Sequence, residues 1–215
     1  YAAKLGSGMD DIDLNLEDFI ARVNSDLVGK LVNIASRCAG FISKRFSGEL
    51  APTLDDLALF SEFSDASEVI AEHYERREYS KAMRVIMTLA DQANRYIEDK
   101  KPWVMIKNDT EVENVQLVCT QGINLFRTLM VYLTPVIPEL AGKTRDFLNE
   151  DEWLWESATT PLLAHKINKF KPLLTRVEKE QVDKMVEQSK DSLGVSDAEP
   201  ATPISDEITI EDFVK

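Results

Sequence analysis

The chain has 215 residues, of which 44% are hydrophobic, and its formal net charge is -13. This composition can bury a core and excludes a disordered protein, and no apolar run of membrane-spanning length occurs. Cys38 and Cys119 lie within apolar helical patterns, which is typical of buried thiols and not of disulfides or a metal cage. Because the N-terminus also lacks a signal-peptide pattern, we expect a soluble cytoplasmic protein that binds no membrane.

The negative charge is concentrated toward the C-terminus. Residues 178–215 carry 11 acidic and 4 basic side chains, which is more than half of the net negative charge. An acidic total weakens the case for general nucleic-acid binding, because such binding depends on cations that release counterions from phosphates. A small local site remains compatible with it.

The first predicted helix starts at Leu16, directly after Asn15, a residue type that caps helix N-termini. It continues to the break at Ser47-Gly48. Apolar side chains recur along it at spacings of three and four residues, as in an amphipathic helix: Phe19, Val23, Leu27, Leu31, Ile34, Cys38 and Phe41. This stripe predicts that one side of the helix faces a core.

The next two helices are predicted from apolar periodicity and from their end signals. One runs from Pro52 to Tyr74 with a break near Ser64, and the other runs from about Glu78 to Glu98. The latter ends before Pro102, because a residue that precedes proline is disfavoured in helical angles. Both are expected to add an apolar face to the core.

The fourth predicted helix, Val115 to Leu133, is strongly apolar. Thr110 and Glu113 precede it in the pattern of a capping box, and Thr134-Pro135 ends it. We therefore expect it to be the most buried helix. A short fifth helix is predicted to reach Phe147.

The C-terminal part changes character several times. Residues 149–178 are interrupted by prolines and predict an irregular stretch, whereas residues 179–193 predict one more helix. The glycine, serine, proline and acid content of residues 194–207 is typical of a linker. Residues 208–215 alternate like the start of a strand.

The sequence thus predicts an all-α helical bundle over residues 16–193. Residues 1–15 are expected to be the end of an upstream segment, and residues 208–215 the beginning of another domain.

No catalytic arrangement of useful specificity occurs in the sequence. A glycine-rich phosphate loop, a nucleophile elbow and paired helical histidines are all absent. His73 and His165 lie far apart, and neither neighbours a cysteine, so a zinc-binding spacing is missing. We therefore expect no catalytic residue, metal or cofactor in this segment.

Asn33 and Arg37 lie one helical turn apart on the polar edge of the first predicted helix. An amide that both donates and accepts then lies beside a planar guanidinium with five donors. Such a pair suits the hydrogen-bonding edge of a nucleobase. It can also tie two helices together, and the spacing leaves both interpretations open.

A basic and aromatic segment, "RYIEDKKPWVMIKND", covers residues 95–109. Pro102 restrains Trp103 just after a helix end, with Lys100, Lys101 and Lys107 close in sequence. An aromatic ring near lysines is typical of proteins that bind single-stranded nucleic acid, because bases stack on the ring and lysines attract phosphates. The ring can equally plug the end of a helix bundle. Its exposure decides between the two.

Four segments, in order, resemble the helical anticodon-binding domain of bacterial methionyl-tRNA synthetases: "RVNSDLVGKLVNIASRCAGF", "LADQANRYIEDKKPW", "GINLFRTLMVYLTPVIPEL" and "HKINKFKPLLTRVE". The resemblance covers nearly the whole chain and implies the anticodon-binding helical bundle of a class I aminoacyl-tRNA synthetase. It implies that residues 1–15 end a connector from the catalytic domain. It also implies that residues 208–215 begin a truncated C-terminal OB-fold domain that binds tRNA.

The resemblance assigns roles to individual residues. Trp103 corresponds to the tryptophan on which the family stacks the cytosine that begins the CAU anticodon. Asn33 and Arg37 correspond to residues implied to hydrogen-bond anticodon bases. Further anticodon-binding residues are implied nearby: Asn94, Arg95, Pro102 and Lys107. Gly29 stands where some members have asparagine, so a contact from that position is lost or replaced.

The resemblance also implies a full-length methionine–tRNA ligase, which attaches methionine to tRNA(Met) using ATP. The family's nucleotide-binding signature motifs are absent from this segment, so ATP is expected to bind outside it. The expected partner is the tRNA(Met) anticodon loop, and the missing C-terminal domain implies that the full-length protein can form a homodimer. The alternative is an all-α protein-interaction scaffold without RNA binding, which the acidity and the apolar helix faces favour.

Overall fold

The computed structural model of the chain describes residues 1–8 and 15–192. Residues 1–176 form one compact unit, and the chain from Val177 onward belongs to a second. Every regular element in the described parts is a helix, which confirms the predicted all-α class. The predicted linker at 194–207 and the strand predicted after it lie outside the described residues.

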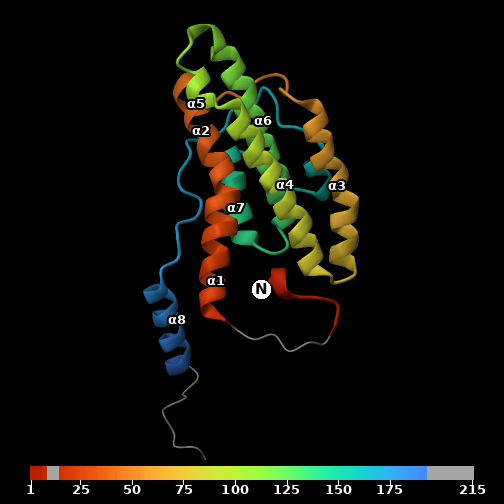
Figure 1. Cartoon of the computed structure of the whole chain (residues 1–215), viewed down its shortest axis with the longest axis vertical. Helices are drawn as coiled ribbons and strands as arrows, with labels where there is room; N and C mark the ends of the chain where they lie inside the picture. The colour runs from red at the N-terminus through yellow and green to blue at the C-terminus, as the bar shows by residue number, and fades with distance from the viewer. Residues whose placement is uncertain (9–14, 193–215) are drawn as a thin grey trace, which may run out of the picture. The chain divides into compact units, whose positions relative to one another are not determined.

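The first long helix runs continuously through three segments (Figure 1): α1 (Leu16–Arg22), the π-helical segment η2 (Val23–Val32) and α2 (Asn33–Arg45). The Asn15 side chain accepts a hydrogen bond from the Asp18 N–H at 2.9 Å, which confirms the predicted N-cap. The 3.6-residue period does not hold through η2, because a π-helix bonds residues five apart. At its end the consecutive residues Leu31 and Val32 are both buried.

The hairpin of α3 (Leu57–Glu75) and α4 (Tyr79–Lys100) follows. The predicted start of α3 at Pro52 and the break near Ser64 are wrong. The Asp56 carboxylate accepts a hydrogen bond from the Leu59 N–H at 2.9 Å and so caps the helix at Leu57. The segment before it is held in another conformation, because the N–H groups of Ala51 and Asp56 donate to side chains of a later helix.

The predicted end of α4 near Pro102 is confirmed, since α4 ends at Lys100. Lys101 has a φ of 51°, in the left-handed region that ends many helices. Pro102 then opens the short helix α5 (Pro102–Met105), at the first helical position, where a missing N–H is harmless. Trp103 is therefore on a helix of its own, which the sequence did not predict.

The 3₁₀ turn η3 (Asp109–Glu111) leads into α6 (Val112–Leu133). The predicted capping box of Thr110 and Glu113 is wrong, because Asn108 accepts from both the N–H and the hydroxyl of Thr110. The prediction that this helix is the most buried is confirmed, since every residue from Val118 to Leu133 is buried. The core forms around α6, which packs against α2, α3 and α4.

α2 and α6 pack against each other at Gly122, which lies against Cys38. A Cβ added to Gly122 would lie 2.6 Å from the Cys38 Sγ and 3.3 Å from the Ile97 Cδ1. The contact also includes Cys119, whose thiol pKa is raised by a hydrogen bond with Cys38 and by burial. The predicted buried thiols are confirmed, because both are free and inaccessible.

We expect Gly122→Ala to lower the free energy of unfolding by about 1–3 kcal/mol, because the core is overpacked there. The measurement is urea-induced unfolding followed by circular dichroism. Gly40→Ala on α2 is the matched control: a Cβ there has nothing within 4 Å, so we expect it to gain up to about 1 kcal/mol. A Gly122→Ala variant as stable as Gly40→Ala would contradict the close packing.

The predicted fifth helix is α7 (Pro138–Leu148), and the irregular stretch after it contains only the 3₁₀ turn η4 (Trp155–Thr159). A polar stripe on the buried helix α6 binds this stretch and the segment before α3 through side-chain hydrogen bonds: Thr120, Gln121, Asn124, Arg127 and Thr128. The predicted helix near residues 179–193 is α8 (Lys179–Ser192), in the second unit.

Candidate nucleic-acid interface

The helix of η2 and α2 runs beside α4 in the same direction (Figure 1). Pairs of side chains meet between them, and in three of these pairs the two residues are 61 positions apart. We call this set the cross-helix ladder: Lys30 with Asp91 (2.8 Å), Asn33 with Asn94 (3.4 Å), and Arg37 with Glu98 (3.1 Å). The equal spacing means that the two helices keep one register over two turns.

The middle contact of the ladder joins two of the predicted site residues. The Asn33 amide donates to the Asn94 Oδ1, while the Asn94 amide donates to the backbone carbonyls of Lys30 (3.0 Å) and Ala90 (2.9 Å). Asn94 therefore ties the two helices together and orients Asn33. Asn33 stands partly exposed at the surface.

Arg37 connects the ladder to the tryptophan. Its guanidinium carbon lies over the Trp103 ring, 5.3 Å from the ring centroid, which is the geometry of a cation–π contact. Trp103 is half-buried and packs against the core. The ring thus closes part of the bundle and also carries a charged side chain on its surface. A structural role in closing the bundle and a role as a stacking surface for bases are therefore compatible.

An open depression of about 440 Å³ lies along the ladder. Four of the seven predicted site residues line it, namely Asn33, Arg37, Asn94 and Arg95. Trp103 joins them through Arg37. The remaining two are not among the lining residues: Pro102 is buried at the start of α5, and Lys107 is exposed beyond its end.

The depression also contains residues that the sequence reading did not single out: Ser25, Lys30, Asp91 and Glu98. A signal for the charged ones exists in the sequence, since Lys30 and Arg37 are seven residues apart and so are Asp91 and Glu98. Seven residues are two helical turns, so each pair lies on one side of its helix. Their partnership depends on the register of two helices, which the sequence alone does not give.

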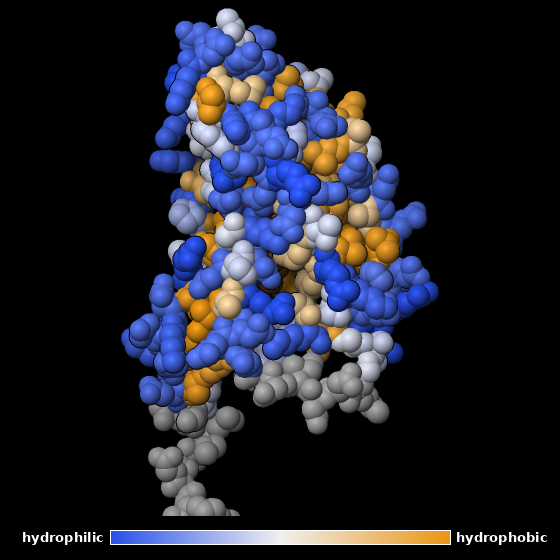
Figure 2. Space-filling view, in the orientation of Figure 1, coloured by the Kyte–Doolittle hydropathy of each residue, from blue (hydrophilic) through white to orange (hydrophobic). Residues whose placement is uncertain are grey.

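The predicted basic rim is partly neutralised in the folded chain. Lys100 forms an ion pair with Asp55 at 2.7 Å and lies 5.7 Å from the Tyr96 ring centroid. The Tyr96 hydroxyl donates to the same carboxylate at 2.8 Å, and burial with this hydrogen bond raises the tyrosine pKa. Lys101 and Lys107 stay exposed. In the view of Figure 2, the surface is mainly hydrophilic, with apolar side chains in separate patches.

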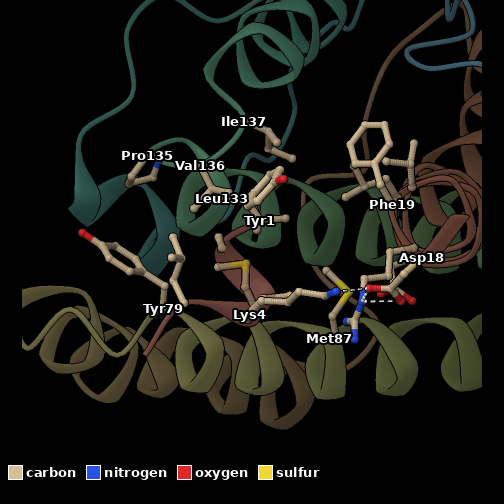
Figure 3. A pocket seen from close by; sticks show the side chains of 18 of the residues that line it. Tyr1, Lys4, Asp18, Phe19, Tyr79, Met87, Leu133, Pro135, Val136 and Ile137 are labelled. Atoms are coloured by element: carbon tan, nitrogen blue, oxygen red, sulfur yellow. Dashed lines mark hydrogen bonds and ion pairs between the residues drawn. The ribbon is translucent and has the colours of Figure 1, made fainter. Parts of the chain in front are cut away.

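A larger cavity of about 500 Å³ lies near Tyr1, at the opposite end of α4 from α5 (Figure 1), and Figure 3 shows its lining. Its walls are mainly apolar, with Phe19 and Met87 facing Leu133 and Ile137, and Lys4 is paired there with Asp18 at 2.8 Å. None of the predicted site residues lines it. We therefore place the candidate site at the ladder and not at the larger cavity.

The parts of the chain that the structure describes contain neither a metal site nor a membrane-spanning helix. No group of three or more histidine, cysteine, aspartate or glutamate side chains there is arranged to hold a metal ion. Nor does any helix in these parts combine the length and the apolar character needed to cross a membrane.

Two protein-family models match the chain. The sequence model of class I tRNA synthetases (M) matches residues 1–39. The model described as the anticodon binding domain of methionyl tRNA ligase matches residues 48–190, which is more than half of the chain. The chain therefore belongs to the family of methionyl-tRNA ligase anticodon-binding domains, as its residues predicted.

Solved structures agree on the fold. Apo methionyl-tRNA synthetase of Mycobacterium tuberculosis is 21% identical with a TM-score of 0.68, over 77% of this chain and 35% of that one. The same enzyme in complex with methionyl-adenylate is 22% identical with a TM-score of 0.66, over 74% and 33%. At this identity the likeness establishes the bundle fold. The chain spans about a third of the length of these structures.

Proposed function

We propose that this segment recognises the CAU anticodon of tRNA(Met) within a full-length methionine–tRNA ligase. Methionine and ATP would bind outside the segment, in the catalytic part of that ligase. In this proposal residues 16–193 are the recognition domain and residues 1–15 are a connector from the catalytic part. The partner is the anticodon loop, in the cytoplasm, and dimerisation would depend on the C-terminal domain that residues 208–215 begin.

The observation that carries the proposal is the meeting of three side chains from two separate elements. Asn33 and Arg37 project from α2, and Trp103 projects from α5, yet Arg37 reaches over the Trp103 ring. An aromatic face, a guanidinium and an amide together supply stacking and directed hydrogen bonds. These are the contacts by which proteins read unstacked RNA bases.

The chemistry favours base recognition over general RNA binding. The ladder pairs Lys30 and Arg37 with carboxylates, and the chain is acidic as a whole, so phosphate attraction is weak here. Bases that leave the anticodon stack are instead stabilised by the Trp103 ring and by amide and guanidinium donors. In this proposal Arg95 and Lys107, which are exposed, supply the few phosphate contacts.

We expect Arg37→Ala to reduce discrimination between CAU and single-base variants by about 1–3 kcal/mol, since a lost base contact relaxes specificity. The measurement is fluorescence anisotropy with labelled hairpins that contain the anticodon stem and loop, at several salt concentrations. Arg84→Ala is the control, because Arg84 is exposed on α4 outside the depression.

Two outcomes would contradict the proposal. Equal loss of affinity for every hairpin in Arg37→Ala would show that Arg37 contacts only phosphate. Failure of the unaltered chain to prefer CAU at any salt concentration would favour the protein-interaction scaffold.

A further inference from the structure

The contacts of Arg37 raise the question of how a base reaches the tryptophan. One face of Arg37 meets the Trp103 ring and one of its nitrogens meets the Glu98 carboxylate. The ring also rests against the core. A base that stacks on the ring face under the guanidinium must therefore displace it.

We propose that Glu98 is a positioning residue for anticodon recognition, which holds Arg37 over the Trp103 ring so that a nucleobase reaches the ring by displacing the guanidinium. The inference rests on the proposed function. Its first half, the placement of Arg37 by Glu98, concerns the protein without RNA and can be decided independently.

The geometry of α4 explains why Glu98 can do this. Glu98 lies in the last turn of α4 and Trp103 in α5, which begins after the single intervening residue Lys101. A carboxylate in that turn holds the guanidinium at the end of the depression nearest to α5. Among the described residues Arg37 forms no other ion pair, so without Glu98 its charge is held near the ring by the cation–π contact.

A base can displace the guanidinium because the ion pair that holds Arg37 is weaker than stacking of the base on the ring. The side chains of Arg37 and Glu98 are 34% and 57% exposed, and ion pairs this exposed are weak. Stacking of a base on tryptophan is stronger than such a pair. Once displaced, the guanidinium is free to donate to base edges. Arg37 therefore covers the ring in the free protein and becomes a base-reading group in the complex.

The ladder supplies a matched control. Asp91 forms the equivalent ion pair with Lys30 at the other end of the ladder, whereas the cation over the Trp103 ring belongs to Arg37. Asp91→Asn removes the same charge from the same helix, two turns before Glu98. An effect of Glu98→Gln that Asp91→Asn does not share cannot be due to net charge alone.

We expect Glu98→Gln to expose the Trp103 ring in the free chain. The measurement is NMR of the whole chain labelled with ¹⁵N-tryptophan, in which the Trp103→Phe variant assigns the Trp103 indole resonance. A soluble paramagnetic agent should attenuate that resonance more in Glu98→Gln than in the unaltered chain, and most in Arg37→Ala. Asp91→Asn should match the unaltered chain.

The proposal that Glu98 holds Arg37 over the ring is overturned if Glu98→Gln leaves the attenuation of the Trp103 resonance unchanged, or if Asp91→Asn raises it equally. Trp153 and Trp155 provide internal references, because they lie in the irregular stretch and not at the ladder.

The proposal that a base displaces the Arg37 guanidinium is tested with the CAU hairpin in a double-mutant cycle. We expect Glu98→Gln to tighten binding by up to about fivefold when Trp103 is present. The gain should vanish in a Trp103→Ala background, where no ring is left to uncover. A gain that persists there would overturn the exchange. If no variant binds the hairpin, the proposed function and the exchange both fail, while the paramagnetic attenuation still decides the placement of Arg37.

Discussion

Replacing Arg127 with methionine is expected to lower the free energy of unfolding by about 3–5 kcal/mol, because it leaves a largely buried carboxylate without its partner. The Arg127 side chain is 7% exposed and that of Glu150 is 14% exposed. Two parallel contacts of 2.7 Å join them, from Nε and Nη2 of Arg127 to the two carboxylate oxygens. This bidentate geometry is the strong form of an arginine–carboxylate pair.

The same guanidinium also holds the backbone of the irregular stretch. Its Nη1 donates to the carbonyls of Ser157 (2.5 Å) and Thr160 (2.9 Å). Methionine fills similar space but satisfies neither carbonyl. The Glu150 carboxylate would keep only the Trp153 indole N–H, at 3.0 Å. The loss therefore combines an uncompensated charge with two unsatisfied backbone acceptors.

Urea unfolding, monitored by circular dichroism, measures the change. Arg84→Met on the exposed side of α4 is the control and should alter stability by less than about 0.5 kcal/mol. Adding Glu150→Gln to Arg127→Met should recover part of the loss, because the buried charge is then removed. An Arg127→Met chain within 1 kcal/mol of the unaltered one would contradict the role of the pair.

Arg127 also illustrates what the sequence could and could not predict about the fold. The helices were predictable because their apolar side chains repeat at helical spacing and their ends carry recognisable signals, as Asn15 and Pro102 do. The polar residues of α6 were not recognised as buried, because their partners are backbone groups from distant segments. For the same reason, the sequence does not predict the start of α3: Gln121 and Thr120 hold the preceding segment in a non-helical path.

The candidate site shows a similar division. Asn33 and Arg37 were predictable as neighbours, since one turn of α2 separates them. The approach of Arg37 to Trp103 depends on Lys101, which has a left-handed backbone conformation between α4 and α5. The sequence does not predict this conformation, because lysine rarely adopts it. The carboxylate of Glu98 was missed because its partner is set by the register of two helices. The sequence therefore predicts which side chains are neighbours within one helix, but not which side chains pair between helices.

Replacing Trp103 is expected to have the largest effect on RNA binding. Loss of a stacked base is worth about 1–3 kcal/mol, so Trp103→Ala should weaken binding of the CAU hairpin by about 5- to 150-fold. Because the ring is half-buried and packs on the core, alanine also removes packing. Trp103→Leu and Trp103→Phe separate these effects. Leucine keeps an apolar plug without a stacking face, and phenylalanine keeps both.

Anisotropy titration with the labelled hairpin distinguishes the two roles of the ring. If the ring is a platform, Trp103→Leu should bind as weakly as Trp103→Ala, and Trp103→Phe should stay close to the unaltered chain. A hairpin that is abasic at the first anticodon position should bind all four chains alike, because nothing remains to stack there. Tight binding of the CAU hairpin by Trp103→Leu would mean that Trp103 only closes the bundle, and that the first base is read elsewhere.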